Sequence, residues 1–163
     1  MSIHCGRVFL LVCCMTLSAR GGILHFVFPL EGSQEIQDPP VVTPATGMGD
    51  VTLNTATNNL AWNVSFEGLL APVTAAHFHG PAPVGMNATV AVPIAGAGAT
   101  SPIVGSTTIT DLQESQIING LWYVNIHSQT FPLGELRGQV VPEPATWALL
   151  AAGLLGCILR RRS

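Results

Sequence analysis

Apolar and polar positions alternate strictly along one stretch near the middle of the chain, 60–67. One face of this stretch is apolar and the other is small or polar; the apolar positions are Leu60, Trp62, Val64 and Phe66. Because successive side chains of a strand point to opposite faces, the pattern predicts a half-buried antiparallel strand. Other segments with extended character are Ile23–Leu30, Gly49–Leu53, Val73–His79, Thr89–Ile94, Thr107–Thr110, Leu121–His127 and Gly134–Val141. Short strands separated by frequent turns predict an all-β fold, an antiparallel Greek-key sandwich or barrel.

A single short helix is predicted between two of these strands. Asp111 is expected to be its N-cap, Glu114 occupies the capping-box position three residues later, and Gly120 ends the helix. The preceding stretch 95–105 is rich in glycine and alanine and is predicted to be a loop.

The N-terminus has the pattern of a secretory signal peptide. Arg7 precedes an apolar run, Val8–Leu17, and small residues follow it. The run is too short to cross a bilayer, which needs about 20 apolar residues. Residues 1–21 are therefore expected to be a signal peptide, cut between Ala19 and Gly22.

The C-terminus combines three features in order. The first feature is the motif Pro142-Glu143-Pro144, whose prolines are expected to end the preceding strand. An uninterrupted run of apolar and small residues, Trp147–Leu159, predicts a hydrophobic helix. The chain then ends with a positive cluster, Arg160, Arg161 and Arg162, which orients such a helix with its arginines in the cytoplasm. The helix is short for a full span, which favours a transient anchor over a permanent one.

This tail, 142–163, resembles the PEP-CTERM sorting signal of Gram-negative bacteria. The resemblance implies recognition by a membrane protease of the exosortase type, cleavage near Pro142–Pro144, and delivery to the cell surface or extracellular matrix. The inner membrane would hold the protein only transiently. A plain tail anchor is the alternative interpretation.

The charge and cysteine content of the segment between the two ends, 23–141, restrict its chemistry. It contains eight acidic residues and a single basic one, Arg137, and the chain has no lysine. Such a surface cannot neutralise phosphates, so nucleic-acid binding is excluded, and an anionic membrane surface would not attract it. All four cysteines lie in the two ends, which leaves this domain without a disulfide, a thiolate nucleophile or a cysteine metal ligand.

Three stretches of this domain resemble the CHRD domain, a module named from chordin and also found alone in secreted bacterial proteins. The first runs from Pro44–Gly47 into the Leu60–Trp62 hairpin, the second is the His-x-His-Gly motif within Ala75–Ala82, and the third combines Gly120–His127 with Gly134–Gln139. Their order along the chain spans nearly the whole domain. The resemblance implies a β-rich extracellular domain, and it implies no particular reaction.

The histidines of the second and third stretches are the candidate chemical site. His77 and His79 are two apart on a predicted strand, so they share one face while Phe78 points to the core. His127 shares a face with Asn125 on another predicted strand. If these strands are neighbours, three imidazoles converge, and three histidines with an open fourth position suit zinc or copper.

The alternative for these histidines is purely structural. In that case they hydrogen-bond to backbone carbonyls, to Asn125 or to Glu135, and they organise the loops around them. Glu135 and Arg137 share a strand face and are expected to pair with each other or with the histidines. His25 has no comparable neighbour in the sequence and is expected to be an ordinary strand residue.

No metal-independent catalytic pattern is present in the sequence. It has no Gly-x-Ser-x-Gly elbow, no phosphate-cradling glycine loop and no carboxylate pair flanked by sugar-stacking aromatics. The leading hypothesis is therefore an exported, non-enzymatic surface or matrix module without a cofactor, which binds a matrix polysaccharide or protein. The alternative is a periplasmic or extracellular zinc or copper protein that uses His77, His79 and His127.

Overall fold

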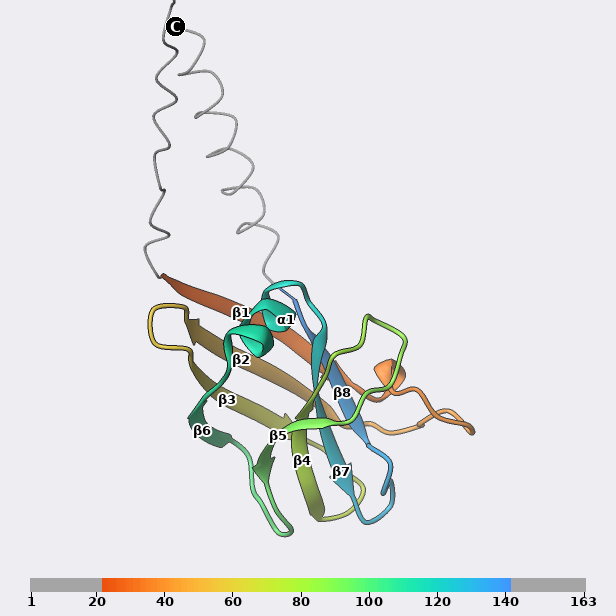
Figure 1. Ribbon diagram of the computed structural model, residues 1–163. Coiled ribbons are helices and arrows are strands. Elements are labelled where there is room, and N and C mark those ends of the chain that lie inside the picture. The colour runs from red at the N-terminus through yellow and green to blue at the C-terminus, as the bar shows by residue number, and fades with distance from the viewer. Residues whose placement is uncertain (1–21, 142–163) are drawn as a thin grey trace, which may run out of the picture.

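The computed structural model describes residues 22–141. Within this part the chain forms eight β-strands, one α-helix and one turn of 3-10 helix (Figure 1): β1 (Ile23–Glu31), η1 (Gly32–Gln34), β2 (Thr46–Asn54), β3 (Asn59–Glu67), β4 (Val73–His79), β5 (Val90–Ala95), β6 (Ile103–Thr108), α1 (Asp111–Ile118), β7 (Trp122–Ser128) and β8 (Leu136–Val140). The predicted signal peptide and sorting tail lie outside the described residues. No helix between residues 22 and 141 is long and apolar enough to cross a bilayer.

The strands form one antiparallel sheet that curls into a nearly closed barrel, in the order β5-β4-β7-β8-β1-β2-β3-β6. Two four-stranded halves are joined where β1 meets β8, and the backbone pairing there is limited to Glu31 with Arg137. Elsewhere the registers are long; β1 and β2 pair along their full lengths, from Ile23–Asn54 to Glu31–Thr46. The predicted all-β antiparallel fold with one short helix is confirmed.

The apolar faces of both halves meet in a single core. Trp62 of β3 packs edge-on against Phe78 of β4, with ring centroids 5.6 Å apart, and Phe78 packs against Trp122 of β7 at 6.0 Å. All three side chains are buried. The predicted apolar faces of β3, β4 and β7 are the ones that face this core, and the histidines of β4 consequently project away from it.

Two local predictions need correction. The N-cap of α1 is Thr110, one residue earlier than predicted, because its hydroxyl accepts from the Gln113 amide while the Gln113 side chain accepts from the Thr110 amide. Asp111 and Glu114 instead lie inside the first turn, where a negative charge is favourable. The second correction is β6, which begins at Ile103 within the predicted loop, because Ile103 pairs with Val64 and is buried in the core.

A glycine in β2 makes room for a core ring. Gly49 lies directly opposite Phe28, and a Cβ atom at Gly49 would overlap the Phe28 ring. Gly49→Ala is therefore expected to lower the free energy of unfolding by about 1–3 kcal/mol, because the ring must leave its packed position. The measurement is a urea titration of the full-length chain in detergent. Gly96→Ala is the matched control, since no atom of residues 22–141 lies within 4 Å of a Cβ there, and an equal effect of both changes would contradict the packing argument.

Candidate metal centre

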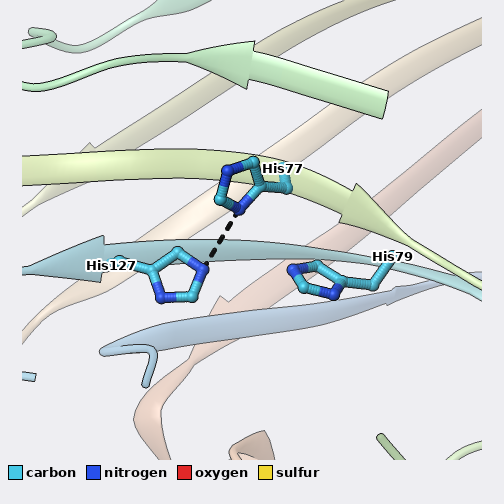
Figure 2. Close-up of side chains that lie close together, drawn as sticks. All are labelled: His77, His79 and His127. Carbon is cyan, nitrogen blue, oxygen red and sulfur yellow. Dashed lines mark hydrogen bonds between the residues drawn. The ribbon is translucent and has the colours of Figure 1, made fainter. Parts of the chain in front are cut away.

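The histidine cluster is assembled by the pairing of β4 with β7. His77 lies opposite Asn125 and Ala75 lies opposite His127, so the two histidines are diagonal neighbours on the same outer face. His79 completes the group from the end of β4. Figure 2 shows the three rings turned toward a common space, and one nitrogen of each ring lies within 4.8 Å of the others. The predicted convergence of the three residues is therefore present in the structure.

Hydrogen bonds to backbone carbonyls orient two of the rings. Nδ1 of His79 lies 3.0 Å from the Ala88 carbonyl oxygen, and Nδ1 of His127 lies 2.9 Å from the Pro132 carbonyl oxygen. Because a carbonyl oxygen only accepts, each Nδ1 carries the proton and each Nε2 keeps its lone pair. Nε2 of His127 is in turn 3.2 Å from Nδ1 of His77, while Nε2 of His79 is buried without a hydrogen-bond partner among residues 22–141.

The environment keeps the three rings neutral. Burial lowers the pKa of His77, and the neighbouring His127 and His79 lower it further. Burial likewise lowers the pKa of His79 and of His127, more than their bonds to backbone carbonyls raise it. Neutral imidazole is the form that binds a metal ion, so none of the three rings has to lose an imidazolium proton near pH 7 before it can coordinate.

The donor set fits zinc or copper. A tetrahedral centre with bonds of about 2.0–2.1 Å places its ligand nitrogens roughly 3.3 Å apart. The His77–His127 pair is already at this spacing, at 3.2 Å, in a hydrogen bond that His77 Nδ1 donates to His127 Nε2. On metal binding this proton would move to Nε2 of His77, and His79 would close in to complete a trigonal face. An imidazole whose other nitrogen donates to a backbone carbonyl is the usual arrangement of a metal-binding histidine. The structural alternative predicts hydrogen bonds from the histidines to backbone carbonyls, and these occur. The same hydrogen bonds would orient the rings of a metal site.

A second layer of side chains holds the cluster in place. The Tyr123 ring stacks on His79, with centroids 4.9 Å apart and planes 7° from parallel. The Arg137 guanidinium lies over the same tyrosine, 3.5 Å from the ring centroid, in a cation–π contact. Arg137 also donates to the Asn87 side chain and to the Met86 carbonyl, and thereby fastens the loop between β4 and β5 to the sheet.

This outer face is covered by loops as well, which the alternation pattern did not predict. The segment after η1 and the loop after β4 lie on the same side of β7 and β8 (Figure 1). As a result Tyr123 and Asn125 are nearly as buried as Val124, the core residue between them. The covering segment contributes Glu35, whose Oε2 accepts from the Asn125 amide at 3.1 Å.

Glu35 is a functional candidate that sequence reasoning missed. Burial raises the pKa of its carboxyl to about 7, although the Arg137 charge and the Asn125 hydrogen bond each lower it. A carboxyl that titrates near neutral pH inside a polar site is characteristic of functional residues. The sequence gives no signal for it, because Glu35 lies in a loop whose position depends on tertiary contacts.

The raised pKa predicts how stability depends on pH. The unfolded chain loses the Glu35 proton near pH 4.5 and the folded chain near pH 7, so folding loses stability as pH rises through this window. Glu35→Gln removes the penalty and is expected to stabilise the protein by about 1–3 kcal/mol at pH 8, with little difference at pH 4.5. Urea titrations across this pH range measure the difference, and the exposed Glu67→Gln is the control. A gap between wild type and Glu35→Gln that does not grow with pH would contradict the assignment.

Other polar residues lie differently from the sequence expectation. Glu135 and Arg137 do not pair; Glu135 accepts from the Thr43 hydroxyl and the Leu70 amide instead. The histidines do not hydrogen-bond to Asn125 or Glu135. His25 does have a partner, because its Nε2 lies 2.6 Å from an Asp50 carboxylate oxygen on the exposed face of β2.

Comparison with known proteins gives two family matches. The CHRD domain matches residues 26–140, and the PEP-CTERM protein-sorting motif matches residues 140–163. No curated protein and no solved structure matches the chain. Neither family is an enzyme family, and the sorting motif implies export, processing by an exosortase-type membrane enzyme and sorting toward the cell surface. The chain therefore belongs to the CHRD domain family and ends in a PEP-CTERM sorting signal.

Proposed function

We propose that this protein is a surface or matrix metal-binding module, in which the CHRD domain holds a zinc or copper ion through His77, His79 and His127. The observation that carries the proposal is the cluster itself: three ring nitrogens lie within 4.8 Å of one another. The carbonyl bonds of His79 and His127 leave their lone pairs on the nitrogens that face the cluster.

The route to the surface follows from the two ends of the chain. A signal peptide over residues 1–21 would direct export, and the hydrophobic segment of the tail would hold the precursor in the inner membrane until the exosortase-type enzyme cuts near Pro142–Pro144. The domain of residues 23–141 would then reach the cell surface or the extracellular matrix, where a polysaccharide or protein is its expected partner.

The proposed role of the domain is binding without catalysis. The domain has no thiol and no lysine, and its one basic side chain, Arg137, is committed to Tyr123 and to the loop after β4. Metal bound by three neutral imidazoles would stabilise the fold and present an open coordination position.

The test is metal loading of the full-length protein. The purified chain in detergent is incubated with zinc or copper, passed over a desalting column and analysed for metal. About one equivalent per chain is expected, since a three-imidazole site binds these ions tightly. Less than about a tenth of an equivalent of either metal would end the metal-binding proposal, and retention of the product in the cytoplasm would end the export proposal.

A further inference from the structure

A cavity of about 300 Å³ adjoins the histidine cluster. The outer face of the sheet and three loops form its walls; the lining residues are Glu35, Ile36, Gln37, His79, Asn87, Ala88, Tyr123, Asn125, His127, Pro132 and Leu133. Two of the proposed metal ligands, His79 and His127, thus line the same cavity as Glu35. A cavity of this size accommodates a small molecule of several non-hydrogen atoms in addition to an ion.

Two hydrogen-bond acceptors in this site lack donors. Oε1 of Glu35 and Oδ1 of Asn125 are buried, and neither has a partner among residues 22–141. An unsatisfied buried acceptor costs about 1–3 kcal/mol, so two of them side by side require an explanation. The Asn125 side-chain amide donates a hydrogen bond to Glu35 Oε2. This bond fixes the directions in which Glu35 Oε1 and Asn125 Oδ1 point.

The backbone is shaped to admit this pair. A Cβ atom at position 134 would overlap Glu35 Oε1 and would lie 2.6 Å from both terminal atoms of Asn125. Gly134 also has a φ of 132°, a conformation that other residues rarely adopt. The glycine therefore allows the carboxyl and the amide to sit together over β7, next to the ligand nitrogens.

We propose that the cavity is a ligand subsite of the metal centre, where Glu35 and Asn125 accept hydrogen bonds from a small neutral molecule that coordinates the metal through an oxygen bearing a proton. Hydroxamic acids are the test class of such ligands. When the hydroxamate oxygen binds the metal, its O–H bond breaks and the proton passes to the Glu35 carboxylate, while the Asn125 oxygen accepts from the ligand N–H. This inference rests on the metal site proposed above.

The electrostatics of the cavity are consistent with this role. The titratable and charged groups around the Glu35 carboxyl are Arg137, Tyr123, His79 and His127. Because its pKa lies at about 7, the carboxyl is present in both protonation states at neutral pH and can take up a proton there. Azide, an anion without a proton, cannot donate a hydrogen bond to these acceptors, and the Glu35 carboxylate repels it.

The experiment uses the full-length protein in detergent, loaded with cobalt(II), whose visible absorption reports its ligands. Acetohydroxamic acid and azide are titrated separately into wild type, Glu35→Gln and the exposed control Glu67→Gln at pH 7. We expect Glu35→Gln to bind acetohydroxamic acid about tenfold more weakly than wild type, because it loses a charged acceptor. Its affinity for azide should stay the same or increase, and Glu67→Gln should match wild type for both ligands.

The outcomes separate the two proposals. If wild type takes up no cobalt, the metal site and the subsite both fall. If cobalt binds but Glu35→Gln and wild type bind acetohydroxamic acid equally, the metal site stands and the role of Glu35 is overturned. A parallel loss of acetohydroxamic acid and azide binding in Glu35→Gln would also overturn it, because that pattern reports a damaged metal site and not a missing proton acceptor.

Discussion

His127→Ala is expected to abolish tight zinc binding, with a fall in affinity of at least about 100-fold. The residue supplies one of three ligand nitrogens, and its Nε2 lies 3.2 Å from the His77 ring. Its Nδ1–H donates to the Pro132 carbonyl, which leaves Nε2 unprotonated and holds it toward the cluster. Isothermal titration of zinc into the full-length chain measures the effect directly.

The same change has a thermal signature. A ligand that binds only the folded state at 100 times its dissociation constant stabilises it by about 2.7 kcal/mol. Zinc should therefore raise the Tm of wild type and leave the Tm of His127→Ala nearly unchanged. His25→Ala is the matched control, since His25 lies on an exposed face and pairs with Asp50 away from the cluster. Equal zinc affinity in His25→Ala and His127→Ala would show that the ion binds elsewhere.

Acid should weaken zinc binding in wild type. Burial lowers the pKa of His77, of His79 and of His127, so the rings stay neutral and ready to coordinate until the pH falls to their lowered range. Below it, protons compete with the metal for the same nitrogens. In the metal-free protein the rings of the unfolded chain bind protons first, so the fold loses stability as the pH falls from the ordinary histidine pKa of 6.5 through the lowered values.

The sequence was sufficient to place the three histidines on the correct faces. A period of two along β4 and β7 fixes which side chains point away from the core, and Phe78 and Trp122 occupy the core as the pattern requires. What the pattern could not supply was the register. His127 meets His77 because Asn125 lies opposite His77, and this alignment depends on how β7 packs against the rest of the sheet.

Glu35 illustrates what lay beyond local reasoning. It is 90 residues from Asn125 in sequence, and the contact forms only because the segment after η1 folds back over β7. No periodicity marks such a segment, and its acidic residue looked like any solvated loop side chain. The burial of Tyr123 and Asn125 was missed for the same reason, because alternation assigns a face and does not tell what covers it.

The charge prediction was limited in a related way. One cation among eight acidic residues suggested an ion pair for Arg137, and Glu135 two positions away was the obvious partner. The two buried side chains instead have different partners: Arg137 lies over Tyr123, and Glu135 accepts hydrogen bonds from the Thr43 hydroxyl and the Leu70 amide. Sequence spacing placed both residues on one strand, but β8 begins at Leu136, so Glu135 lies in the bend before it, and tertiary packing decides the partners of both.

Replacement of Pro142, Glu143 and Pro144 by alanine is expected to leave nearly all of the protein as an uncleaved, membrane-bound precursor. These residues are the motif after which the sorting signal is named, and the match to that signal covers residues 140–163. The hydrophobic segment Trp147–Leu159 and the arginines that follow would still hold the chain in the membrane. The mass of the protein recovered from membrane and surface fractions measures the cleavage.

A proline in the domain provides the control for this experiment. Pro83 is exposed in the loop after β4, so Pro83→Ala removes a proline from the domain without touching the tail. Its product should be cut and delivered like wild type, whereas the triple variant should keep the mass of the full tail. Because none of the three histidines belongs to the tail, the uncleaved precursor should still load zinc normally. Cleavage of the triple variant at the wild-type rate would mean that the enzyme recognises the hydrophobic helix or the arginines, and that the Pro-Glu-Pro residues serve only to end β8.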